Sequence, residues 1–128
     1  MIVLDTHAWI WWANDPAKLG RMARREIARV RKIGVPAVCC FELATLVAHD
    51  RIRLDRPPFH WMQDALALPL VDLIPITPAV AVKAAELPPD FPGDPADRLI
   101  TATAILESAL LITKDQRLQD SKLVRTAW

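Results

Sequence analysis

Residues 1–12, MIVLDTHAWIWW, pass from a short apolar segment to a helical one within a few positions. Met1 to Leu4 are apolar and include branched residues, which is typical of a buried strand. Asp5 and Thr6 come next, and both are common helix N-cap residues, so a short helix is predicted over THAWIWWAN. Asp5 therefore marks the point where a strand ends and a helix begins.

Strands and helices are predicted to alternate along the rest of the sequence as well. From Lys18 to Ile33, apolar residues recur at helical spacing, and Gly34 is expected to end this helix. A second strand is predicted over 35–39, followed by a helix from about Phe41 that carries Glu42 in its first turn. Further strands are predicted over 71–77 and 110–113 and near 124–128, and further helices over 60–68, 76–87 and 96–109.

This order predicts an α/β fold. Strands that alternate with helices form a central parallel sheet, here of four to five strands, with right-handed crossovers and helices on both faces. Pro75 suggests that the third strand lies at an edge of the sheet, because proline cannot donate a ladder hydrogen bond. A chain of 128 residues fits one domain, 1–128, which can bury a core without disulfides or metal.

Composition excludes several classes of protein. No apolar run approaches the about 20 residues that a membrane span requires, and the N-terminus has no basic leader, so a cytoplasmic protein is expected. The net charge of +1 does not by itself point to a nucleic-acid partner. Cys39 and Cys40 are adjacent, which disfavours a disulfide between them, and we expect reduced thiols. The histidines and cysteines show no spacing typical of a zinc site, and no P-loop is present.

Four acidic residues, Asp5, Glu42, Asp97 and Asp115, lie where apolar segments give way to predicted helices. Parallel strands present their carboxyl ends to one edge of the sheet, so these side chains can converge there. Crowded carboxylates repel one another unless a cation holds them ionised. Hard cations such as Mg²⁺ prefer oxygen ligands, and one or two of them can activate water for phosphodiester hydrolysis. The pattern therefore predicts a metal site.

Each acid also has a local explanation that involves no metal. Asp5 and Asp115 can cap the helices that follow them. Asp97 belongs to a D-P-x-D sequence in which Asp94 is the N-cap and Asp97 faces the helix dipole. Glu42 can be an exposed side chain on its own helix. The metal-site hypothesis therefore depends on whether the four side chains meet in space.

Longer motifs surround the four acids. The sequence contains MIVLDTHAWIWW at the start, FELATL followed by HDRIRL, the block GDPADRLITATA and the closing LLITKDQRL. Together these motifs resemble those of the PIN-domain nucleases, specifically the VapC-type toxins of bacterial toxin–antitoxin pairs, over nearly the whole chain. The resemblance implies a PIN-like three-layer sandwich.

The resemblance also implies an activity, a cofactor and partners. It predicts an endoribonuclease that depends on Mg²⁺ or Mn²⁺, is inhibited by a cognate antitoxin and is commonly a dimer. Asp5 and Asp97 would be the best metal ligands, and Glu42 and Asp115 would complete the site, directly or through water. The alternative is a PIN-like RNA-binding or regulatory domain without catalysis, which should lack one or more of the four acids.

Basic and aromatic residues offer further contacts. Trp9 and Trp12 share one helix face and are expected in the core, so Trp11 must point elsewhere, either to a dimer interface or to a nucleobase. Arg98 and Lys114 can meet a substrate phosphate or pair with neighbouring acids. Six of the sixteen basic residues are expected on one helix, as a solvated face or a surface for RNA or antitoxin: Arg21, Arg24, Arg25, Arg29, Arg31 and Lys32.

Overall fold

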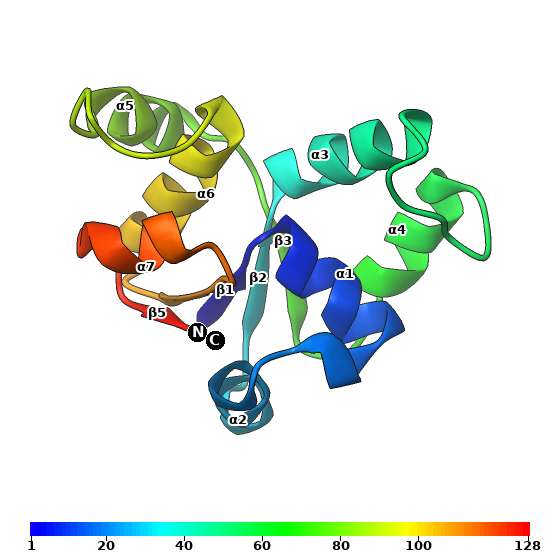
Figure 1. Ribbon diagram of the computed structural model, residues 1–128. Helices are drawn as coiled ribbons and strands as arrows, with labels where there is room; N and C mark the ends of the chain where they lie inside the picture. Colours follow the sequence, from blue (N-terminus) through cyan, green and yellow to red (C-terminus); the bar gives the residue numbers. More distant parts are fainter.

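A five-stranded sheet runs through the middle of the fold (Figure 1). The computed structural model describes residues 1–128. The strand order is β3-β2-β1-β4-β5, and every neighbouring pair is parallel, which confirms the predicted α/β class. The strands are β1 (Ile2–Leu4), β2 (Ile33–Pro36), β3 (Val71–Ile74), β4 (Leu110–Ile112) and β5 (Thr126–Ala127).

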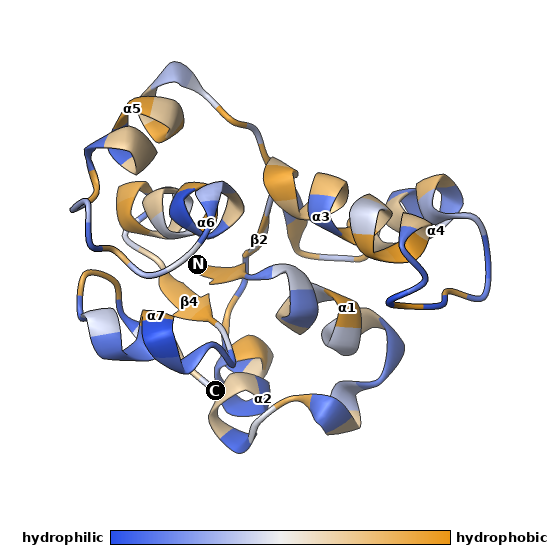
Figure 2. Cartoon of the chain, turned by 45° about the horizontal axis from the view of Figure 1, so that its top comes forward, coloured by the Kyte–Doolittle hydropathy of each residue, from blue (hydrophilic) through white to orange (hydrophobic).

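Helices cover both faces of this sheet and make three layers. In Figures 1 and 2, α5, α6 and α7 lie on one side, while α1, α3 and α4 lie on the other. No helix has the length and apolar character needed to cross a membrane. The helical elements are α1 (Thr6–Asn14), η1 (Pro16–Lys18), α2 (Arg21–Arg29), α3 (Ala37–Ala48), α4 (Pro58–Leu66), α5 (Pro78–Glu86), α6 (Pro95–Leu106) and α7 (Gln116–Ser121).

The core lies between the sheet and these helices. All three residues of β1 are buried, because β1 has a strand on each side and helices on both faces. Trp9 on α1 is fully buried and packs edge-to-face against Trp61 on α4, with ring centroids 5.2 Å apart. The indole N–H of Trp61 donates a hydrogen bond to Oδ1 of Asn14 at 2.8 Å. The prediction that Trp9 belongs to the core is confirmed, and this packing fixes α1 against α4.

The predicted helix over residues 18–33 was too long. It is replaced by η1 and by α2, which ends at Arg29, and Val30 already has extended backbone angles. Gly34 does not end a helix but lies inside β2, where it pairs with β1 and β3. A Cβ at this position would come within 2.5 Å of the Ile74 side chain, so glycine allows β2 and its neighbours to pack closely. The six basic residues consequently do not share one helix, since Arg31 and Lys32 follow α2.

The second strand lies earlier than predicted. It was expected over 35–39, but β2 ends at Pro36 and α3 begins at Ala37, so Cys39 is helical. A short apolar run has no periodicity that separates a buried strand from a buried helix. Both cysteines are free thiols, as predicted, and Cys39 is buried. Glu42 therefore lies in the second turn of α3 instead of the first.

Candidate active site

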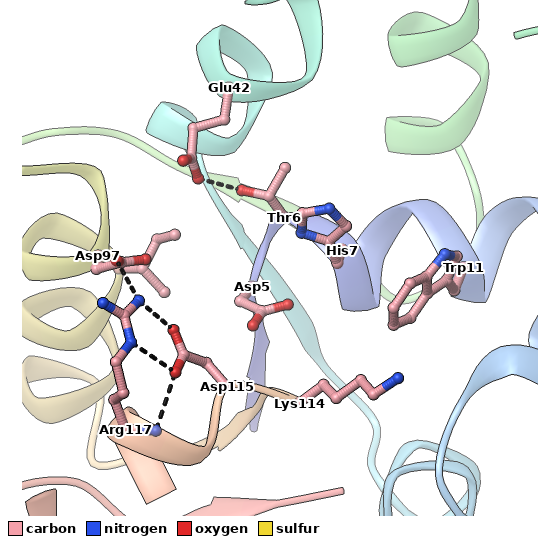
Figure 3. Close-up of a pocket in the computed structure, with 10 residues that line it drawn as sticks. Asp5, Thr6, His7, Trp11, Glu42, Asp97, Lys114, Asp115 and Arg117 are labelled. Carbon is pink, nitrogen blue, oxygen red and sulfur yellow. Dashed lines mark hydrogen bonds and ion pairs between the residues drawn. The ribbon is translucent and has the colours of Figure 1, made fainter. Parts of the chain in front are cut away.

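The carboxyl ends of the strands open into a cavity of about 570 Å³ that contains all four predicted acids (Figure 3). β1 and β4 are neighbours, and the chain leads outward from them in opposite directions along the sheet. In open α/β sheets, ligands bind at such a switch in strand order. The cavity is lined by Asp5, Thr6, His7, Trp11, Glu42, Asp97, Ile100, Lys114, Asp115 and Arg117.

Asp5 stands at the centre of this edge of the sheet because it directly follows β1. It is the N-cap of α1, and its Oδ1 accepts a hydrogen bond from the backbone N–H of Ala8 at 2.8 Å. Its own backbone N–H donates to the carbonyl of Ile112 at 3.1 Å, which ties it to the end of β4. Burial raises the pKa of Asp5 above its usual value, although the hydrogen bond from Ala8 acts in the opposite direction. Both the cap and the convergence predicted for Asp5 are therefore present.

Asp97 lies in the first turn of α6 and forms a capping box with Asp94, as the D-P-x-D sequence predicted. Its backbone N–H donates to Oδ1 of Asp94 at 2.9 Å, and the Asp94 N–H donates back to Oδ2 of Asp97 at 3.2 Å. Gly93, with φ of +129°, makes room for this carboxylate, since a Cβ there would lie 2.7 Å from its Oδ2. Burial, together with the charges of Asp94, Glu42 and Asp115, raises the pKa of Asp97 to about 6.

Asp115 caps α7 and is held by a residue that the sequence analysis did not single out, Arg117. The Nη2 of Arg117 lies 2.7 Å from Oδ2 of Asp115, and its Nε donates to Oδ1 at 3.1 Å. The same Nη2 is 3.6 Å from Oδ2 of Asp97, so one guanidinium spans two of the four acids (Figure 3). Hydrogen bonding to Arg117 lowers the pKa of Asp115. Arg117 lies two residues after Asp115, a predicted N-cap. This spacing was the one feature of the sequence that could have indicated an ion pair between them.

Glu42 reaches the cavity from α3 and is held by Thr6. The hydroxyl of Thr6 donates a hydrogen bond to Oε1 of Glu42 (Figure 3). Thr6 is buried and follows Asp5 directly, but the sequence showed it only as a residue of N-cap type. Glu42 is therefore not the freely solvated side chain that its local explanation describes.

The two basic residues predicted near the acids differ in position. Lys114 lines the cavity. Arg98 does not, because its guanidinium donates hydrogen bonds to backbone carbonyls and lies 5.6 Å from the centroid of Phe91. The accepting carbonyls are those of Ala84, Leu87 and Pro88. Arg98 thus ties α5 and the following loop to α6 and does not face the acids.

The residues around the cavity suit a hard divalent cation by the chemistry of their donors. Four carboxylates face one space, and carboxylate oxygens are the donors that such a cation prefers. No three acidic, histidine or cysteine side chains are close enough together to hold an ion as they stand. Arg117 engages both oxygens of Asp115, so a shared ion competes with this pair, whereas Thr6 engages only Oε1 of Glu42. The assignment of the four acids as metal ligands and catalytic groups stays a prediction.

The sequence matches a known protein family and a known relative. The family model described as the PIN domain matches residues 2–122. The chain is 42% identical to Ribonuclease VapC22 of Mycobacterium tuberculosis over 99% of this chain and 98% of that protein.

Solved structures show the same fold. VapBC2 from Rickettsia felis, bound to a DNA fragment of its promoter, has a chain that superimposes with a TM-score of 0.72, at 15% identity, over 99% of this chain and 98% of that chain. A toxin–antitoxin complex from Klebsiella pneumoniae gives a TM-score of 0.67, at 19% identity, over 100% of this chain and 97% of that chain. The family model and the 42% identical relative together show that the chain belongs to the PIN domain family and is of the VapC type.

Proposed function

We propose that this protein is a Mg²⁺- or Mn²⁺-dependent endoribonuclease and the toxin component of a toxin–antitoxin pair. The observation that carries the proposal is the meeting of Asp5, Glu42, Asp97 and Asp115 in one cavity, from four segments of the chain. The name of the 42% identical relative, a ribonuclease, supports RNA as the substrate. A PIN-like domain without catalysis is disfavoured because it has no need to keep four carboxylates together at an unfavourable electrostatic cost.

Asp5 and Asp97 would hold the cation, and Glu42 and Asp115 would complete its ligands directly or through water. A bound Mg²⁺ or Mn²⁺ supplies Lewis-acid polarisation of the phosphate and lowers the pKa of bound water. The capping hydrogen bonds fix one oxygen each of Asp5 and Asp97 and leave the other oxygen for a ligand. The protein therefore positions its two principal ligands through the same contacts that start α1 and α6.

The basic side chains of the cavity have a different role from the acids. Four carboxylates repel an RNA phosphate, and Lys114 and Arg117 are the two basic side chains of the cavity that offset this repulsion. Arg117 holds Asp115 in its ionised form, as the lowered pKa of Asp115 indicates. Thr6, through its hydrogen bond to Oε1, holds the Glu42 carboxylate in place. These residues orient the acids and attract the phosphodiester.

A protein antitoxin and a second copy of the chain are the proposed partners. Solved relatives with this fold are described as toxin–antitoxin complexes, which supports an antitoxin for this chain. For a homodimer, support comes from Leu73, Ile76 and Val82, which are about half exposed and lie on β3, on the loop after it and on α5. β3 is also an edge strand of the sheet, and an exposed edge can pair with another chain. Light scattering should show a dimer that Leu73→Asp and Val82→Asp weaken, and a monomer at all concentrations would contradict this part of the proposal.

The activity is tested with the purified protein and end-labelled structured RNAs. We expect internal cleavage with Mg²⁺ or Mn²⁺ and none after chelation with EDTA, since the acids alone provide no electrophile. Mapping both labelled ends separates internal cleavage from removal of terminal nucleotides. RNA binding without cleavage under every metal condition would favour the non-catalytic alternative, and cleavage that persists in EDTA would contradict metal dependence.

A further inference from the structure

One wall of the acidic cavity is aromatic and carries no carboxylate. His7 and Trp11 lie one turn apart on α1, both line the cavity, and their ring centroids are 5.5 Å apart with a tilt of 54°. The side chain of Lys114 extends toward Trp11, and its Nζ is 5.6 Å from the ring centroid (Figure 3). The cavity thus has an acidic side, which suits a metal ion and a phosphate, and an aromatic side, which suits neither.

Trp11 contributes only in part to the packing of α1 against the core. Trp9 and Ile10 on the same helix are buried, whereas Trp11 is only partly buried and His7 is exposed. Trp128 contacts Trp11 with ring centroids 5.6 Å apart and does not line the cavity, so it supports Trp11 from outside. Trp128 is itself fixed, because its carbonyl accepts a hydrogen bond from the Met22 N–H at 3.2 Å. The indole of Trp11 is therefore a pre-positioned surface at the cavity.

Lys114 is a cation that no carboxylate of the protein neutralises. Arg117, the other basic side chain of the cavity, is paired with Asp115 and Asp97. Lys114 forms no ion pair and is exposed. It stands beside Asp115 in the sequence, but its side chain extends to Trp11, so its ammonium group lies at the aromatic wall (Figure 3). A phosphate is the ligand group that best fits this unpaired positive charge.

We propose that His7 and Trp11 form a stacking platform for one unpaired nucleobase next to the scissile phosphate, and that Lys114 contacts the phosphate of that nucleotide. The inference rests on the proposed ribonuclease function and adds a requirement to it. Proteins that recognise single-stranded RNA stack its bases on aromatic and histidine side chains and follow its backbone with basic residues. A base inside a duplex is covered by its neighbours, so the platform selects unpaired segments such as loops. The incoming base stacks on the face of Trp11 and displaces the Lys114 ammonium, which then contacts the phosphate.

The test combines RNA lacking one base with variants of Trp11. Oligoribonucleotides with a single abasic residue, placed in turn at each unpaired position and on both sides of the cleaved bond where one is found, are compared with the intact RNA by fluorescence anisotropy and by cleavage rate. With the wild-type protein, removal of the base at one adjacent position should weaken binding about tenfold, within the range for loss of one stacked base. Trp11→Phe should keep this discrimination, because phenylalanine still stacks. In Trp11→Leu, intact and abasic RNA should bind equally.

The possible outcomes separate the platform from the hydrolysis. If the abasic effect depends on Trp11 but the wild type cuts no RNA, the platform stands and the ribonuclease proposal fails. If RNA is cut but no abasic position affects binding, or the losses from Trp11→Leu and from base removal simply multiply, the platform is overturned. The abasic series on the wild type decides this even if Trp11→Leu does not fold. Loss of dimerisation in Trp11→Leu without a change in the abasic effect also overturns it and assigns Trp11 to a protein interface.

Discussion

Thr6 on α1 donates its hydroxyl hydrogen to Glu42 on α3, two residues that are 36 positions apart in the sequence. Thr6 is buried at the cavity edge, and Asp5, not Thr6, caps the helix. The Thr6 hydroxyl therefore has no capping task and is used to direct a carboxylate. Through this contact, the start of α1 controls an acid that belongs to another helix.

Replacement of Thr6 by valine should lower RNA cleavage about tenfold while the fold is kept. Valine has the same shape but cannot donate a hydrogen bond, and a hydrogen bond to a charged group contributes about 1.5–3 kcal/mol. The measurement is the single-turnover cleavage rate at saturating Mn²⁺, with the circular dichroism spectrum as a check of folding.

Thr101→Val is the matched control for this substitution. Thr101 lies on α6, is fully buried, and its Oγ1 has no hydrogen-bond partner. Valine removes an unsatisfied polar atom there, so the free energy of unfolding should rise by about 1 kcal/mol and cleavage should stay unchanged. Equal cleavage by Thr6→Val and the wild type would show that the Thr6–Glu42 contact has no role in the reaction.

Without divalent metal, Asp97 should make the protein less stable as the pH rises from about 4 to about 6. The pKa of Asp97 is about 6 in the folded protein and about 4 in the unfolded chain. Between these values the folded state binds more protons than the unfolded state, so the free energy of unfolding falls with increasing pH. The contribution of Asp97 is fully present below pH 4 and is lost by about pH 6.

The comparison with Asp97→Asn isolates this contribution. Asparagine keeps an oxygen that can accept the capping hydrogen bond but carries no charge. In EDTA at pH 7.5 we expect the variant to be more stable than the wild type by on the order of 2 kcal/mol, with no difference below pH 4. The measurement is urea unfolding across this pH range. Parallel pH profiles for the two proteins would rule out a raised pKa at Asp97.

Arg117→Gln should bind Mn²⁺ about two- to fivefold more tightly than the wild type, which is the range expected for an exposed ion pair. Arg117 now occupies the carboxylates of Asp115 and Asp97, and its side chain is 60% exposed. Its removal frees both acids for the ion. Isothermal titration calorimetry in metal-free buffer measures the dissociation constant.

Arg56→Gln serves as the control for this experiment. Arg56 also pairs with two acids, Asp55 and Asp64, but lies outside the acidic cavity. Its loss should leave the Mn²⁺ affinity unchanged. Weaker Mn²⁺ binding by Arg117→Gln would contradict the competition between the guanidinium and the ion.

The elements that were predictable from the sequence are those decided by local interactions. The helix over Thr6–Asn14 was predicted with its observed bounds, because a strand, an N-cap residue and a helical segment follow one another within a few positions. The capping box of Asp94 and Asp97 was predictable for the same reason. The edge position of β3 followed from Pro75. The second strand was misplaced because both β2 and the start of α3 are short, apolar and buried.

The geometry of the site could not be predicted without knowing the strand order. Asp5 and Asp115 line the same cavity because β4 pairs with β1, a contact between residues over 100 positions apart that no local pattern specifies. The positions of Thr6 and Arg117 depend in the same way on how helices pack at the end of the sheet. Arg98 shows the converse: it adjoins Asp97 in the sequence, but the helical turn directs it to the carbonyls near α5. Adjacency along the chain thus did not indicate which basic residue faces the acids.

The central claim is that the four converging carboxylates hydrolyse RNA together, and the rate of RNA cleavage in variants of each acid tests it most directly. Asp5→Asn, Glu42→Gln, Asp97→Asn and Asp115→Asn are measured at fixed Mn²⁺, with Asp72→Asn, an acid paired with Lys32 outside the cavity, as the control. We expect each of the four variants to lose activity by about 100-fold or more and the control to match the wild type. Wild-type rates in all four variants, with each protein folded, would contradict the account.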